Sequence, residues 1–218
     1  MVAAPPPARA FWLLGFSTAD TVPTGQFAAI AGTGGQYSSV GSPAYGSFTP
    51  FLAHAGIRYG LTDNFDIGYR LTTLPLPFSS VGPTLGGEID GKLRLTPRGN
   101  PFQAAIIAGM GYAYLQLQGA QRNAYSPGVD LTLSRRLGSG ITGIAELRYV
   151  YTAIPSAVGG ATANAVSAAG VDLGSRIAIN QRVGLVPELG LFRLNGAIGG
   201  RDQRGYGLQY GVVLSFKI

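Results

Sequence analysis

The 218-residue chain contains no cysteine, and this absence excludes disulfides, thiolate metal sites and cysteine nucleophiles. It has a single histidine, His54, which leaves little scope for a histidine-rich metal centre or a conventional hydrolase triad. Only 12% of the residues are charged and 10% are aromatic, a composition that argues against disorder. The 34 glycines follow no period of three, which excludes collagen.

Long apolar runs are also absent. Residues 21–57, 99–121 and 150–171 carry no formal charge apart from His54, but Gly, Pro, Ser, Thr and Gln interrupt all three stretches. None supplies the roughly twenty consecutive apolar residues that a membrane-spanning helix needs. The first residues, Met1-Val-Ala-Ala-Pro-Pro-Pro7, lack a basic region followed by an apolar core, and we expect them to begin a mature chain that was restarted with Met.

The recurring pattern is an alternation with a period of two. In Glu88-Ile-Asp-Gly-Lys-Leu-Arg-Leu95 the even positions are charged, while the odd positions are apolar or Gly. This spacing places polar side chains on one face of a β-sheet and apolar side chains on the other. Ten such segments are predicted, at roughly residues 25–37, 47–60, 64–75, 84–97, 101–117, 122–136, 140–153, 163–178, 182–194 and 206–218.

The connections between the segments alternate in length. Tight turns are predicted at residues 61–64, 98–100, 137–140 and 180–181. The other connections, around 38–46, 76–83, 118–121, 154–162 and 195–205, are generally longer, at roughly five to eleven residues, and rich in Gly, Pro and Ser. The pattern predicts an all-β fold, a ten-stranded antiparallel up-and-down transmembrane β-barrel with both termini at the short-turn end.

The aromatic residues indicate that the apolar face contacts lipid. On the expected strands they gather near the two ends and are rare in the middle, as bilayer interfaces favour. The core of a soluble, lipocalin-like barrel predicts no such bands. The short-turn girdle contains Phe27, Tyr59, Phe65, Phe102 and Phe216, and the long-loop girdle includes Tyr112, Tyr114, Tyr149 and Tyr151.

The C-terminal segment Gln209-Tyr-Gly-Val-Val-Leu-Ser-Phe216 places Gln209, Gly211, Leu214 and Phe216 in alternation. It resembles the assembly signal of small bacterial outer-membrane β-barrel proteins, although Lys217 and Ile218 follow where that pattern usually ends on the aromatic residue. With the strand pattern, the resemblance covers nearly the whole chain from Thr24. It implies residence in the outer membrane, periplasmic termini, contact with outer-membrane lipids and lipopolysaccharide, and recognition by the barrel-assembly machinery.

If the apolar face contacts lipid, the opposite face lines the lumen. It carries nearly every strand charge: Arg58, Asp66, Arg70, Glu88, Asp90, Lys92, Arg94, Asp130, Glu146, Arg148, Asp172, Arg176 and Glu188. Arg70, Lys92 and the four acids Asp130, Glu146, Asp172 and Glu188 are expected at similar depth, as one belt with the remaining arginines just above or below. Such a network either fills a narrow barrel or forms a charged constriction for small solutes or ions.

Catalysis and nucleic-acid binding are not expected. His54 falls on the lumen face, away from lipid substrates, and no serine is identifiable beside it. The net charge of +6 resolves into lumen charges and a few rim arginines such as Arg201 and Arg204, which can contact lipopolysaccharide phosphates or stay solvated. No basic face with interleaved aromatics is present for nucleic acid, and no metal or other cofactor is predicted.

Residues 1–23 form a lead-in segment before the barrel of residues 24–218. The segment contains Pro5–Pro7 and Phe11-Trp-Leu-Leu-Gly-Phe16, and it can lie along the periplasmic interface, enter the lumen as a plug or dock a partner. The leading hypothesis is a structural or anchoring component of the cell envelope, within a multiprotein complex. A narrow channel is the alternative, and a lipid-modifying enzyme is a distant third.

Overall fold

The computed structural model describes residues 17–41, 44–73, 85–117 and 120–217. Every regular element among them is a β-strand, and none is a helix long and apolar enough to cross a membrane. The strands are β1 (Phe27–Val40), β2 (Tyr45–Thr62), β3 (Phe65–Thr73), β4 (Leu85–Arg94), β5 (Phe102–Leu117), β6 (Ala120–Gly138), β7 (Ile141–Ala153), β8 (Ala165–Ala178), β9 (Val183–Ile198), β10 (Arg201–Asp202) and β11 (Gly205–Lys217).

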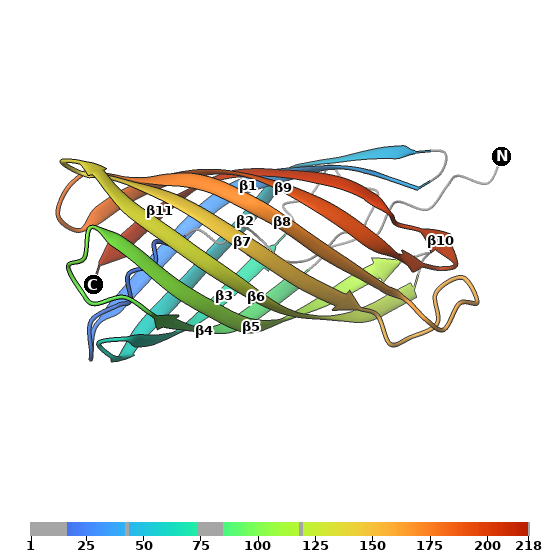
Figure 1. The fold of residues 1–218 in the computed structure, drawn as a ribbon. Helices are drawn as coiled ribbons and strands as arrows, with labels where there is room; N and C mark the ends of the chain where they lie inside the picture. The colour runs from blue at the N-terminus through green and yellow to red at the C-terminus, as the bar shows by residue number, and fades with distance from the viewer. Residues whose placement is uncertain (1–16, 42–43, 74–84, 118–119, 218) are drawn as a thin grey trace.

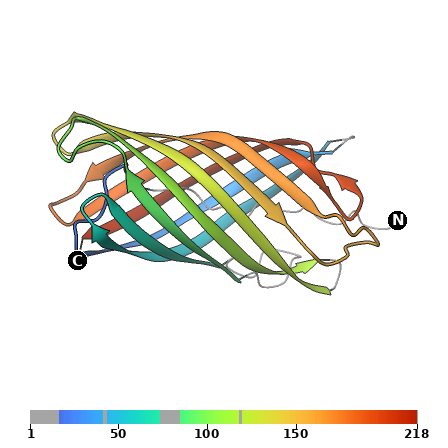
Figure 2. The same ribbon diagram turned by 60° about the horizontal axis from the view of Figure 1, so that its bottom comes forward.

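The ten long strands close into a barrel, as the sequence predicted. Each pairs antiparallel with its neighbours in the chain, β8 pairs with β9, and β11 pairs with β1 from Ala28↔Lys217 to Val40↔Gly205. The two-residue β10 only extends β9 in a terminal hairpin, and the sequence pattern did not predict it. The strands tilt steeply across the barrel, and β1 begins at the end of the barrel where β11 finishes (Figures 1 and 2).

The connections are shorter than expected at two places on the long-loop rim. β1 ends at Val40 and β2 begins at Tyr45, and only two residues separate β5 from β6. The prediction of longer loops there is wrong because β2 and β6 extend to 18 and 19 residues and continue the hairpins beyond the predicted strand ends. The predicted loop at 76–83 lies outside the described residues.

Alternating side chains separate the two surfaces of the wall. On β7, Glu146, Arg148 and Val150 are buried in the lumen, while Leu147 and Tyr149 are 53% and 47% exposed on the outside. The same division gives an outer surface rich in large exposed apolar residues from every long strand whose side chains are described. Surfaces that face water rarely carry large continuous apolar areas. The outer wall is therefore suited to lipid.

The lumen is packed with apolar side chains at both ends. Near the long-loop end one buried cluster comprises Val40, Ala113, Ala124, Ile154, Val158, Val166, Ala168, Phe192, Leu194 and Ile198. Near the short-turn end Ile144, Val186 and Val213 pack together with Ile30. Buried charged residues lie between these clusters and beside the second one.

The residues predicted for the girdles and the assembly signal lie on the expected strands. All nine girdle residues lie on the wall strands with outward parity and half-buried or exposed side chains. Phe27 and Tyr59 contact each other with ring centroids 4.7 Å apart. On β11, Gln209 points into the lumen and Leu214 outward. Their roles in interface anchoring and assembly remain predictions.

A single charged substitution tests the lipid-facing surface. Leu173 lies near the middle of β8 and is 59% exposed on the outer wall. Leu173→Arg is expected to lower the free energy of unfolding by about 2–4 kcal/mol in lipid vesicles, because arginine is costly at the bilayer midplane. Leu137→Arg, at a 66% exposed position beside the β6–β7 turn, is the matched control and is expected to cost about 0–1 kcal/mol. Equal losses in urea titrations of the two variants would contradict a lipid-facing position for Leu173.

Candidate functional site: a charged lumen closed at the short-turn mouth

Three charged residues from three neighbouring strands form the first buried group. Arg58 of β2 faces Asp66 of β3 and Asp90 of β4, and its Nη2 lies 2.6 Å from an oxygen of each carboxylate. Its Nε also donates to Asp66 Oδ1 at 2.9 Å, and its Nη1 donates to Asp90 Oδ2 at 3.1 Å. Arg58 therefore bridges two carboxylates with the fork of donors that lysine lacks. Gly68 lies directly below, and any side chain there would meet the guanidinium.

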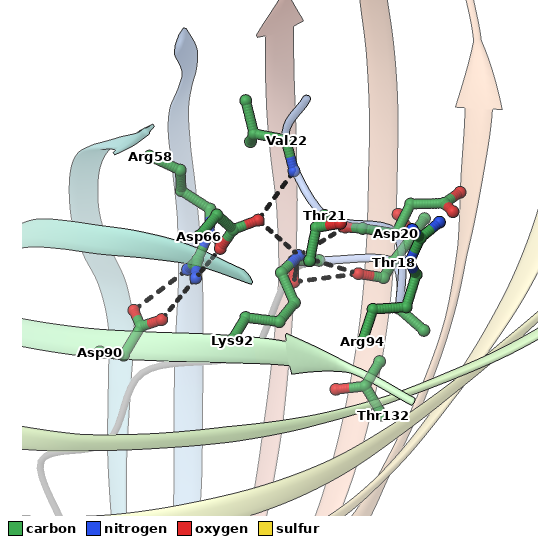
Figure 3. Close-up of polar contacts among 12 residues, drawn as sticks. Thr18, Asp20, Thr21, Val22, Arg58, Asp66, Asp90, Lys92, Arg94 and Thr132 are labelled. Carbon is green, nitrogen blue, oxygen red and sulfur yellow. Dashed lines mark hydrogen bonds and ion pairs between the residues drawn. The ribbon is translucent and has the colours of Figure 1, made fainter. Parts of the chain in front are cut away.

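Lys92, next to this group on β4, holds the segment that precedes the barrel. Its Nζ donates to the carbonyl oxygens of Thr18 and Asp20 at 3.1 and 2.8 Å and to Ser17 Oγ at 3.1 Å, and it lies 3.9 Å from Asp66 Oδ2 (Figure 3). Lys92 is only 2% exposed, so these acceptors replace the hydration of its ammonium group.

The segment is fixed at further points. The Val22 amide donates to Asp66 Oδ2 at 2.8 Å, the Ala19 amide to Ser134 Oγ at 3.2 Å, and Thr21 Oγ1 to the Asp63 carbonyl at 2.7 Å. Ala19 is completely buried. Residues 17–22 thus occupy the lumen at the short-turn mouth, which is the plug arrangement for the described part of the lead-in; Pro5–Pro7 and residues 11–16 lie outside the described residues.

The chain leaves the lumen over the β2–β3 turn. Thr24 Oγ1 donates to Asp63 Oδ1 at 3.0 Å, and Thr24 forms an isolated bridge with Gly60. This hydrogen bond from Thr24, assisted by Arg98 at 3.8 Å, holds the pKa of the exposed Asp63 carboxyl below its usual range. The contact is therefore complete above the ordinary aspartate pKa and weakens only as the pH falls below it.

The second buried group surrounds Arg148 of β7. Its Nε lies 3.2 Å from Asp130 Oδ1 on β6, and its Nη2 lies 2.7 Å from Glu146 Oε2 and 3.3 Å from Asp172 Oδ2 on β8. The ring of Phe192 covers the guanidinium at 5.8 Å from its centroid. All four charged side chains are 1% exposed, so one cation faces three carboxylates with almost no contact with water.

The structure contains only part of the expected belt: its four acids lie together beside Arg148, whereas the other lumen charges form separate groups. Arg70 pairs with Glu88 at 3.6 Å, Lys92 binds the lead-in, and Arg94 donates to the Asp63 carbonyl and to Asn64 Oδ1.

Arg176 is not part of the network. It lies half-buried over Gly184, beside Arg136 at the short-turn rim, with no described carboxylate in salt-bridge range. The other twelve predicted network residues are at most 9% exposed.

The sequence analysis missed several residues that contact the buried charges, because the alternation on which it relied describes the strands alone. Phe192 is one of them, because its contact with Arg148 depends on how β7 and β9 approach across Gly170 of β8. The polar run Ser17-Thr-Ala-Asp-Thr21 is the one signal that distinguishes the plugging residues from the apolar lead-in before them. His54 is buried on the lumen face, as its parity predicted, close to Gly32.

Solved structures share this fold at low sequence identity. The outer membrane protease OmpT from Escherichia coli is 11% identical, with 92% of this chain and 100% of that chain covered and a TM-score of 0.58. An outer membrane channel from Pseudomonas putida is 10% identical, with 94% and 100% covered and a TM-score of 0.52. No family model and no curated protein matches the chain. The likeness shows the fold alone: a closed antiparallel barrel of the kind found in bacterial outer-membrane proteins.

Proposed function

We propose that this chain is an integral barrel of the bacterial outer membrane with a closed lumen, acting as a structural or anchoring component of the cell envelope within a multiprotein complex. The observation that carries the proposal is the burial of the lumen charges: twelve charged side chains that would line a water-filled pore are at most 9% exposed. Most of them are instead paired with one another, and Lys92 binds the lead-in.

The two ends of the lumen support the same function. Residues 17–22 fill the short-turn mouth, and the apolar cluster that includes Ile154, Val158 and Phe192 fills the lumen near the long-loop rim. A selective pore needs a continuous polar path with binding weak enough to release its solute. Packed apolar side chains and buried charges, most of them paired, are better suited to rigidity than to conduction.

The orientation and partners form part of the proposal. Short turns face the periplasm and longer loops face outward in outer-membrane barrels. The start of β1 and the end of β11 are therefore assigned to the periplasm. Arg201 is exposed on the long-loop rim and is available to lipopolysaccharide phosphates, whereas Arg204 is paired with Asp202 at 2.9 Å. The C-terminal residues Gln209 to Phe216 serve the barrel-assembly machinery during insertion.

No catalytic role is assigned to this chain. His54 is 5% exposed inside the lumen, whereas the substrates of lipid-modifying barrels lie outside the wall. The neighbouring structures include both a protease and a channel on the same fold, and fold alone supplies neither activity.

Solute entry into proteoliposomes tests the closed lumen. Vesicles that contain the purified protein are expected to swell in isotonic solutions of small sugars, amino acids and salts no faster than protein-free vesicles. Vesicles with a general porin provide the positive control. Swelling that is faster than in empty vesicles, and fastest for the smallest solute, would favour the narrow channel over the structural barrel.

A further inference from the structure

The acids around Arg148 outnumber the cations available to them. Arg148 contacts Asp130, Glu146 and Asp172, and Glu188 of β9 joins the same group from the next strand, opposite Gly174 of β8. Arg70, which lies on the facing wall, is paired with Glu88 at 3.6 Å. Within the described part of the chain, four carboxylates therefore share one guanidinium in a region that is shielded from water, where uncompensated charge is costly.

Glu188 is the residue that this group leaves unsatisfied. It is 7% exposed, yet it forms no salt bridge with any residue of the described chain, and its Oε1 has no hydrogen-bond donor there. Asp172 is 1% exposed, and its Oδ1 likewise has no donor among the described residues. A buried carboxylate oxygen without a donor normally indicates a missing partner.

Three carboxylates of this group converge, one each from β7, β8 and β9. Glu146, Asp172 and Glu188 each offer one carboxylate oxygen, and these oxygens lie within 4.8 Å of one another. A calcium ion binds oxygen ligands at about 2.3–2.6 Å, so oxygens up to about 5 Å apart can share one. Magnesium requires about 2.0–2.1 Å and a near-ideal octahedron, which this spacing fits less well. An all-oxygen, all-carboxylate set is suited to hard cations and lacks the nitrogen or sulfur ligands that zinc or copper prefer.

Glycines keep this space open. Gly190 of β9 lies opposite Asp172, and a Cβ at Gly190 would overlap Asp172 Oδ1. Gly174 of β8 lies opposite Glu188, and a Cβ there would contact the Glu188 side chain at 3.4 Å. Small residues at both cross-strand positions thus leave the two carboxylates free to turn toward Glu146.

We infer that Glu146, Asp172 and Glu188 form a binding site for one divalent cation of the size of calcium inside the barrel. The ion supplies the positive charge that Arg148 alone cannot, and it links β7, β8 and β9 across the lumen. The site does not depend on whether the lumen conducts, because it uses side chains of the wall only.

Calcium uptake during refolding tests the site while avoiding slow entry into a closed lumen. The full chain is stripped of metal with a chelator in urea and refolded into detergent micelles with radioactive calcium, and bound ion is measured by equilibrium dialysis. We expect one calcium per folded chain with a dissociation constant of about 1 mM or tighter. Folding is checked for each sample by the shift of the unheated band on gels.

Two isosteric variants separate the site from general lumen charge. Glu188→Gln is expected to weaken calcium binding by about tenfold or more, whereas Glu88→Gln, which changes a carboxylate already paired with Arg70, is expected to weaken it less than about threefold. Glu188→Gln also removes the unpaired charge, so its thermal unfolding is expected to be independent of calcium while that of the wild type rises with calcium. Absence of bound calcium in folded wild-type protein, or equal binding by wild type and Glu188→Gln, would overturn the inference.

Discussion

Replacement of Arg148 by methionine is expected to lower the free energy of unfolding by about 3–5 kcal/mol. Methionine keeps the unbranched apolar stem and removes the charge, so Asp130, Glu146 and Asp172 lose a guanidinium that lies within 3.3 Å of each of them. All three are buried, so water cannot replace the guanidinium without opening the lumen. Urea titration in lipid vesicles, followed by circular dichroism, measures the loss.

Two further variants make the test specific. Arg201→Met, at an exposed position on the rim, is the matched control and is expected to change the unfolding free energy by less than about 0.5 kcal/mol. Glu146→Gln in the Arg148→Met background removes one of the stranded charges and is expected to recover part of the loss. A loss below about 1 kcal/mol in Arg148→Met would mean that these carboxylates are not held by Arg148.

Gly60→Ala is expected to expel residues 17–23 from the short-turn mouth. Gly60 lies directly beneath this segment, and a Cβ there would overlap the carbonyl oxygen of Pro23 and approach that of Val22 at 2.5 Å. Because these atoms are backbone, the segment has to move away as a unit, and Lys92 then loses the acceptors that it finds at Ser17, Thr18 and Asp20. The expected cost is about 2–4 kcal/mol, since hydrogen bonds to a buried charge are among the stronger ones.

Amide hydrogen exchange of Ala19 and Val22 reports this displacement directly. In the wild type both amides donate to side chains of the barrel, Ser134 and Asp66, and we expect them to be protected from exchange. In Gly60→Ala they are expected to exchange as in a free peptide. Gly86→Ala is the matched control, because a Cβ there meets nothing closer than 3.6 Å, and it is expected to leave both amides protected. Persistent protection in Gly60→Ala would show that the segment is not held in the mouth by this contact.

The period of two in the sequence was sufficient to predict the fold. Alternation across a strand leaves only two faces, so once lipid was assigned to the apolar one, residues such as Asp130 and Glu146 had to lie in the lumen, where they are found. Strand number followed from counting the alternating segments, and the up-and-down barrel followed from the alternation of short turns with generally longer connections.

The pairing of charges could not be predicted in the same way. Which acid meets which arginine depends on the stagger between strands: Arg148 lies opposite Asp130 of β6 and Gly170 of β8, and it reaches Asp172 diagonally. Depth counted from each turn places Lys92 among the acids, whereas the lead-in, which has no periodicity, takes that side chain for itself. Arg176 shares the lumen parity but ends at the rim, because β8 stops only two residues later at Ala178.

Single-channel recording in planar bilayers tests the closed lumen most directly. After insertion of the purified wild-type protein, with folding confirmed on gels, we expect a baseline without steady unitary currents over a wide range of salt concentration and voltage. Among the described residues the lumen charges are buried and apolar side chains fill the lumen near both ends, an arrangement that we propose leaves hydrated ions no path. Reproducible unitary currents whose amplitude rises with salt concentration would contradict the closed barrel and assign the chain to the channels.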